Sequence, residues 1–128
     1  EMCIRDRTRI EEFLGDGCLI ATPAGSSAYN LSLRGPVIPV GAKVLALTPI
    51  SPYRPRRWRG ALLTNDAKIT LYAIDSKLRP VRAEADFMQF ENIDRLEIEL
   101  EKKLFVNLLF DPGHDLEERI INEQFNNS

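Results

Sequence analysis

Short segments in which apolar and polar residues alternate constrain the fold of this chain more than any other feature. The clearest is residues 96–100, where three apolar residues alternate with two glutamates. Residues 68–73 and 81–85 repeat the pattern, whereas residues 43–48 and 103–110 are more uniformly apolar. A period of two places successive side chains on opposite faces of a strand. Such strands at short spacing predict a mainly β fold, a layered antiparallel β-sandwich.

Two helices are expected beside these strands. Residues 28–33 can form a short helix, because Gly35 and Pro36 supply the usual glycine-then-proline ending. Asp115 followed by Glu118 predicts a capping box that starts a C-terminal helix. This helix is expected to be amphipathic and to pack on the domain's own sheet or on another domain. Its apolar residues near helical spacing are Leu116, Ile120 and Phe125.

Composition limits the class of protein. A chain of 128 residues with 44% hydrophobic and 28% charged residues is typical of one globular domain. The net charge of −2 gives no general attraction to nucleic acid or to an anionic membrane. Residues 1–12 lack the apolar core of a signal peptide, and no stretch is long enough for a membrane span. We therefore expect a cytoplasmic protein without a membrane partner.

Cysteine and histidine are too sparse for a metal or disulfide framework. The chain has Cys3, Cys18 and a single histidine, His114. Cys18 falls in the apolar run 18–21, where a cysteine is more often a small core residue than a ligand. One histidine and two distant cysteines cannot form a zinc site. No metal ligand is therefore expected in this chain.

Residues 15–29 join a Gly-Asp-Gly turn, a buried strand, a loop of small residues and a helix start. Small residues let a ligand approach the backbone, and a helix N-terminus offers free N–H donors. The combination suits a nucleotide or a sugar-bearing ligand. An ordinary turn followed by a loop that caps a helix explains the same residues without a ligand.

Two familiar loop motifs do not fit this segment. It lacks the Gly-Lys-Ser/Thr with which a Walker A loop holds phosphates. It also lacks the Gly-x-Ser-x-Gly of a hydrolase nucleophile elbow, and a Ser/His hydrolase would depend on His114. Neither a P-loop nucleotidase nor a serine hydrolase is therefore expected.

The motif in residues 15–29 resembles the NAD-binding segment of bacterial NAD kinases. Gly-Pro at 35–36, Leu-Thr-Pro-Ile-Ser-Pro at 47–52 and the tail at 109–120 follow in the order of that family. The resemblance runs from about residue 13 to residue 125 and leaves residues 1–12 as a poorly matched N-terminal segment. It implies the carboxy-terminal NAD-binding domain alone. The family's amino-terminal α/β domain, with its catalytic Gly-Gly-Asp-Gly motif, is missing, as is its Asn-Glu motif.

The resemblance implies an activity, although no catalytic residue is expected in this chain. NAD kinases phosphorylate NAD at the adenosine 2′-hydroxyl to make NADP, with ATP (or polyphosphate) as donor and a divalent metal such as Mg²⁺. The metal would not be ligated by this chain. The domain is expected to bind NAD and to be inactive alone. Its implied partners are NAD, the missing domain and further copies of itself, as a homodimer or homotetramer.

The resemblance also implies a set of NAD-contacting residues. Hydroxyls can read a purine edge, and a tyrosine can pack flat on a ring. Without the family, the aspartate is an ordinary solvated turn residue, the serines of the loop cap a helix, and Tyr29 packs in the core. The implied residues are Asp16, Ser26, Ser27, Ala28, Tyr29, Ser32, Ser51 and Tyr53.

Residues 53–59 form the strongest local charge cluster, with four arginines, a tyrosine and the only tryptophan. Arginine and aromatic residues together can bind phosphates and stack on bases. The favoured interpretation is a solvated loop whose Trp58 docks on the core, because the rest of the chain shows no basic face. Two alternatives to an NAD kinase remain: a lipid kinase of the same superfamily, and a non-enzymatic nucleotide- or RNA-binding β domain.

Overall fold

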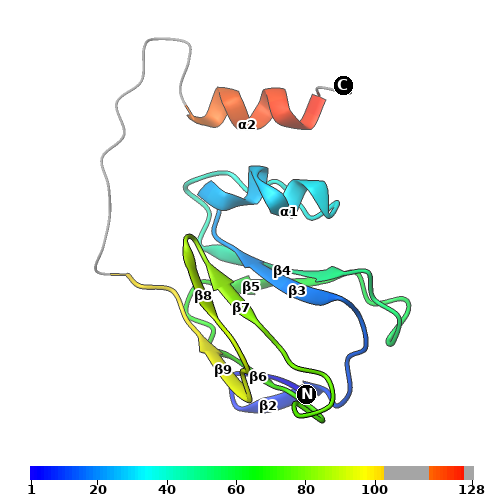
Figure 1. Ribbon diagram of the computed structural model, residues 1–128. Helices are drawn as coiled ribbons and strands as arrows, with labels where there is room; N and C mark the ends of the chain where they lie inside the picture. The colour runs from blue at the N-terminus through cyan, green and yellow to red at the C-terminus, as the bar shows by residue number, and fades with distance from the viewer. Residues whose placement is uncertain (103–115, 126–128) are drawn as a thin grey trace. The chain divides into compact units, whose positions relative to one another are not determined.

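The computed structural model describes residues 1–102 and 116–125. The chain divides into two compact units, one from Glu1–Phe13 with Asp66–Leu100 (unit 1) and one from Leu14–Asn65 with Glu101–Ser128 (unit 2). Within the described residues all strand pairs are antiparallel and the helices are short, so the predicted mainly β, antiparallel class is confirmed (Figure 1). The predicted strand at 103–110, the cap at Asp115, His114 and the tail at 109–115 lie outside the described residues.

Unit 1 is built on a four-stranded sheet with the order β2-β1-β6-β9, and a two-stranded ribbon, β7-β8, is separate from it. β6 pairs with β1 on one side and with β9 on the other, and its Ile69 is fully buried. The predicted alternation is confirmed in β9, where Leu96 and Ile98 are half-buried and Arg95 and Glu97 are exposed. The strands are β1 Met2–Ile4, β2 Arg7–Ile10, β6 Ile69–Tyr72, β7 Ala83–Ala85, β8 Met88–Phe90 and β9 Arg95–Ile98.

The hairpin of β1 and β2 was not expected from the sequence. Ile4 pairs with Arg7, so the loop has only two residues, Arg5 and Asp6. Both have positive φ, 53° and 58°, as a type I′ turn requires. A type I′ turn normally carries Asn-Gly or Asp-Gly. Because the chain has Arg5-Asp6 there instead, the sequence did not indicate the hairpin. The segment 1–12 therefore contributes two strands to the main sheet of unit 1.

Unit 2 holds a three-stranded sheet with the order β3-β4-β5 and two short helical turns after β3. Ala21, Ile38 and Ala46 form the centre of its apolar core. Figure 1 shows α1 lying over this sheet. The elements are β3 Gly17–Ala21, the 3₁₀ turn η1 Ala24–Ser27, α1 Tyr29–Ser32, β4 Val44–Ile50, β5 Ala61–Thr64 and α2 Leu116–Phe125.

β4 runs two residues further than the sequence indicated, through Pro49 to Ile50. A proline has no backbone N–H and cannot donate a hydrogen bond to a neighbouring strand. β5 pairs only with residues from Val44 to Leu47, whereas β3 pairs with β4 up to Ile50. At Pro49 the strand therefore has a neighbour on one side only, which is where a proline is tolerated.

The predicted short helix at 28–33 is present as the α1 turn, which Gly35 and Pro36 follow. It has only four residues, too few to be stable by helix propensity alone. At the C-terminus a helix occupies Leu116–Phe125, and Phe125 is exposed. The apolar stripe expected on that helix stays a prediction.

Cys18 lies in β3, and burial raises the pKa of its thiol. A raised pKa means that the folded chain holds this proton more tightly than the unfolded chain does. The stabilisation that this proton contributes to the folded state is fully present below the ordinary thiol pKa of about 8.5. It is lost as the pH rises through the pKa of the folded chain. We expect the free energy of unfolding to fall more steeply above pH 8.5 in the native chain than in Cys18→Ala. Urea titrations of both proteins between pH 7 and pH 10 measure the difference, and parallel curves would contradict it.

Candidate functional site

The implied NAD-contacting residues fall into two groups at opposite ends of β3. Gly17 pairs with Ile50 at one end and Ala21 pairs with Ala46 at the other. Asp16, Ser51 and Tyr53 therefore gather at the first end, and the helical turns at 24–32 follow the second. At about 3.3 Å per residue, the five residues of β3 separate the groups by roughly 16 Å. An elongated ligand suits this arrangement better than a compact one.

Backbone hydrogen bonds fix the first group. The N–H of Asp16 donates to the Ile50 carbonyl at 3.0 Å, and the N–H of Tyr53 donates to the Leu14 carbonyl at 2.7 Å. Leu14 and Arg54 also form a β-bridge. Asp16, Ser51 and Tyr53 are all exposed, and Ser51 has a φ of +46°. The structure thus brings together three implied site residues that lie up to 37 positions apart in the sequence.

Ser26 belongs to the fold rather than to the surface. It is completely buried, its hydroxyl donates to the Pro23 carbonyl at 2.7 Å, and it accepts the N–H of Ile38 at 2.8 Å. Thr22 accepts the N–H of Gly25 at 3.2 Å in the same loop. Neither helical turn has a side-chain cap, so the capping role considered for Ser26 is wrong. Its hydroxyl instead ties the loop to the segment that leads into β4.

Asn30 is the residue that sequence reasoning missed. It is fully buried, and its amide donates to the carbonyls of Ser26 at 3.3 Å and Pro36 at 2.9 Å. Its amide oxygen accepts the hydroxyl of the buried Thr48 at 2.5 Å. The side chain thereby joins η1, the segment after α1 and β4. Ser26 and Asn30 lie in two separate turns, because Ala28 between them has a non-helical ψ of −124°. No helical period therefore links the two residues, and no local pattern in the sequence indicated Asn30.

The opposite face of the same turns is open to solvent. Ala28 and Ser32 are exposed, Ser27 is half-buried and Tyr29 is 55% exposed. Core packing of Tyr29, the alternative considered from the sequence, is therefore wrong. A largely exposed tyrosine beside small residues leaves its ring free to pack against a ligand. The inward face holds the turns in place, and the outward face is the candidate contact surface.

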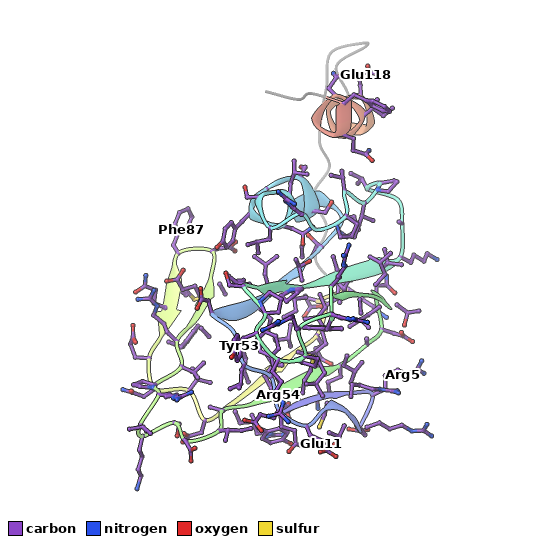
Figure 2. The ribbon with its side chains drawn as sticks, turned by 90° about the vertical axis from the view of Figure 1, so that its right-hand side faces the viewer. Arg5, Glu11, Tyr53, Arg54, Phe87 and Glu118 are labelled. Atoms are coloured by element: carbon purple, nitrogen blue, oxygen red, sulfur yellow. The ribbon has the colours of Figure 1, made fainter. Side chains whose placement is uncertain are left out.

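Residues 51–60, which we name the arginine loop, connect β4 to β5. Tyr53 is 67% exposed, and the Arg56 guanidinium lies 5.8 Å from the centre of its ring. Figure 2 labels Tyr53 and its neighbour Arg54. Trp58 is half-buried, and its backbone N–H donates to the Pro55 carbonyl at 3.3 Å. Docking of its side chain on the core stays a prediction. Arg54, Arg56, Arg57 and Arg59 are all exposed.

The part of the chain that the structure describes offers no metal centre and no membrane-spanning helix. No three His, Cys, Asp or Glu residues gather there closely enough to hold a metal ion. No described helix is both long and apolar enough to cross a bilayer. The described residues therefore do not fit a divalent metal.

Comparison with known proteins decides the family. A family model described as the ATP-NAD kinase C-terminal domain matches residues 3–83, which is more than half of the chain. The chain belongs to this family. The match of the ATP-NAD kinase C-terminal domain model confirms the resemblance that the sequence motifs indicated. The match begins inside the segment 1–12, where residues 2–10 form the hairpin of β1 and β2.

Relatives of this ATP-NAD kinase C-terminal domain include NAD kinases of known sequence. The NAD kinase of Hyphomonas neptunium is 50% identical over 125 residues, which are 98% of this chain and 49% of that protein. That of Xylella fastidiosa (strain Temecula1) is 52% identical over 122 residues, or 95% of this chain and 47% of that protein. The chain thus spans about half the length of the curated relatives it matches.

Solved structures agree on the fold of the domain. Yeast NADH kinase, solved with NADH, superposes with a TM-score of 0.63 at 24% identity, over 76% of this chain and 29% of that one. An NAD kinase from Archaeoglobus fulgidus, solved with ATP, gives 0.67 at 24% identity, over 79% and 38%. At this identity the likeness shows the fold alone.

Proposed function

We propose that this chain is the NAD-binding domain of an NAD kinase, which transfers a phosphoryl group from ATP to the adenosine 2′-hydroxyl of NAD. The observation that carries the proposal is identity near 50% to NAD kinases over almost the whole chain. The same similarity favours an NAD kinase over the lipid kinase and the RNA-binding module that the sequence left open.

The two faces of the turns at 24–32 divide the work in this proposal. Asn30 and Ser26 hold the loop, and the outward Ser27, Ala28, Tyr29 and Ser32 contact the adenosine end of NAD. Asp16, Ser51 and Tyr53, at the other end of β3, contact the rest of the dinucleotide. Phosphoryl transfer depends on positioning and on charge stabilisation around the phosphates. Binding and orientation of NAD are the share of this chain.

The catalytic base, the divalent metal and the donor phosphates are assigned in this proposal to an amino-terminal α/β domain. Relatives are about twice as long as this chain, which leaves room for such a domain. We further propose a homodimer or homotetramer in the cytoplasm as the working form. The 128-residue chain alone is then expected to bind NAD without converting it.

We expect Tyr29→Ala and Asp16→Asn each to weaken NAD binding at least tenfold, or about 1.4 kcal/mol. Calorimetric titration of NAD into the purified chain measures this. Tyr72→Ala and Asp75→Asn are matched controls, because both residues are exposed and belong to unit 1. Equal weakening by a site variant and its control would contradict the assignment of these residues.

A chimera tests the activity itself. The amino-terminal half of the Hyphomonas neptunium NAD kinase, joined to this chain, is expected to form NADP from NAD and ATP, whereas the chain alone forms none. The purified chimera must be free of the NAD kinase of the expression host. A folded chimera that binds NAD but makes no NADP would overturn the proposed activity.

A further inference from the structure

The arginine loop concentrates positive charge on a rigid base. Residues 51–60 contain four arginines and no acidic residue, so a chain of net charge −2 carries −6 elsewhere. Within residues 1–102 and 116–125, no ion pair involves any of the four. Repulsion among unpaired like charges disfavours their gathering unless an anion is bound. The loop therefore has the charge of an anion-binding site.

The loop is held in shape before any ligand arrives. At its start, Tyr53 and Arg54 both donate backbone N–H groups to the Leu14 carbonyl, at 2.7 and 3.1 Å. At its end, Gly60 adopts a φ of +109° and lies tightly against the Leu47 carbonyl. Because both ends of the loop are fixed, its backbone loses less conformational entropy when a ligand binds. The planar guanidinium groups suit the oxygens of phosphates, which they can bind in pairs.

An apolar depression adjoins the loop. It has a volume of about 180 Å³ and is lined by Pro36, Leu47, Arg59, Gly60, Ala61 and Leu62. Arg59 therefore belongs both to the charged loop and to the wall of this depression. None of the implied NAD-contacting residues lines it. A guanidinium beside an apolar surface suits a flat aromatic ring, on which arginine can stack.

We propose that the arginine loop and this depression form a second nucleotide site, for a nucleoside with linked phosphates. The base lies in the depression beside Arg59, and the phosphates lie against Arg54, Arg56 and Arg57. The apolar part excludes an inorganic anion as the preferred ligand. The depression is separate from the surface at 27–32, whereas the loop itself also carries Ser51 and Tyr53 of the implied NAD-contacting set. The site requires no turnover, so ATP binding there is tested independently of the proposed kinase activity.

A small nucleotide fits this surface better than a nucleic acid does. The basic region is limited to ten residues of a chain whose pI is about 5.5. Binding of an RNA strand draws on a basic groove that follows its backbone over several nucleotides. One loop can neutralise two or three phosphates, as in ATP, but it offers no such track.

Calorimetry with the 128-residue chain tests the site, and emission from Trp58, the only tryptophan, reports on the loop itself. ATP is expected to bind at least tenfold more tightly than tripolyphosphate or adenosine. Arg56→Gln combined with Arg57→Gln is expected to weaken ATP binding at least tenfold. The charge-matched control is Arg7→Gln with Arg9→Gln, two exposed arginines of unit 1, and it is expected to change ATP binding less than twofold. Circular dichroism verifies that every variant is folded.

Four results would overturn the proposal. Absence of saturable ATP binding would remove the site. Equal loss in the loop variant and the control variant would reduce it to general charge attraction. Tripolyphosphate bound as tightly as ATP would exclude a base subsite, and a single-stranded RNA decamer bound more tightly than ATP would reassign the loop to nucleic acid. Loss of kinase activity in the chimera with ATP binding intact would affect the proposed function alone.

Discussion

Asn30→Ala is expected to destabilise the domain by about 3 kcal/mol or more. The substitution leaves the carbonyls of Ser26 and Pro36 and the hydroxyl of Thr48 without the partner that each has now. A buried polar group that loses its partner costs about 1–3 kcal/mol. The four-residue α1 is too short to be stable without tertiary contacts. The loop at 22–28 is therefore expected to become less ordered as well.

Chemical denaturation of Asn30→Ala against the native chain measures this loss. Ser32→Ala is the matched control, since Ser32 lies in the same helix but is exposed, and a change within 0.5 kcal/mol is expected there. Thr48→Val completes a double-mutant cycle, in which a coupling of about 1 kcal/mol or more to Asn30 is expected. A loss in Asn30→Ala no larger than in Ser32→Ala would show that the network does not stabilise the domain.

The network also explains a constraint on Gly35. A Cβ at this position would lie 2.3 Å from the amide oxygen of Asn30. The Gly35 N–H donates to the Asn30 backbone carbonyl at 2.9 Å, so the two residues are held together from both sides. The glycine that the sequence identified as a helix ending thus also makes room for the side chain that positions the candidate site.

The strands with clear alternation were predictable from the sequence because one face of each is buried. β9 follows the period of two, whereas burial in β6 decreases from Ile69 to Tyr72 without alternating, and β3 is the apolar run before the small-residue loop. The hairpin at Arg5 and Asp6 was not predictable, because its positive φ angles fall on residues that carry no turn signature. The local pattern of apolar and polar residues therefore predicted strands but did not predict the turn between β1 and β2.

In the candidate site, too, some residues were predictable from the sequence and others were not. The exposed residues of the loop, such as Tyr29, came from the family motif. Asn30 did not, because its role depends on Thr48 and Pro36, and a single sequence does not show which distant residues meet. Ser26 was read as a ligand contact or a cap, whereas the structure gives it the N–H of Ile38, twelve residues away. Long-range hydrogen bonds are the part that motif and periodicity leave out.

Gly60→Ala is expected to have an even larger effect than Asn30→Ala. A Cβ at Gly60 would lie 2.3 Å from the Leu47 carbonyl oxygen and 3.3 Å from Pro49 Cδ, and a backbone atom in the central strand cannot move aside. Alanine is also strained at a φ of +109°. Leu47 pairs with Ala61, the next residue, so relief of the contact opens the β4–β5 pair. We expect a loss of about 4 kcal/mol, or no folding at all.

Gly41→Ala is the matched control for this prediction. A Cβ at Gly41 meets nothing within 4 Å, and the substitution is expected to change stability by less than about 1 kcal/mol. Thermal unfolding followed by circular dichroism compares the two variants, and Trp58, two residues before Gly60, reports on the loop. Because the same close contact fixes the end of the arginine loop, a partly folded Gly60→Ala should also lose ATP binding. Equal melting temperatures for the two variants would show that the Gly60 contact does not constrain the loop.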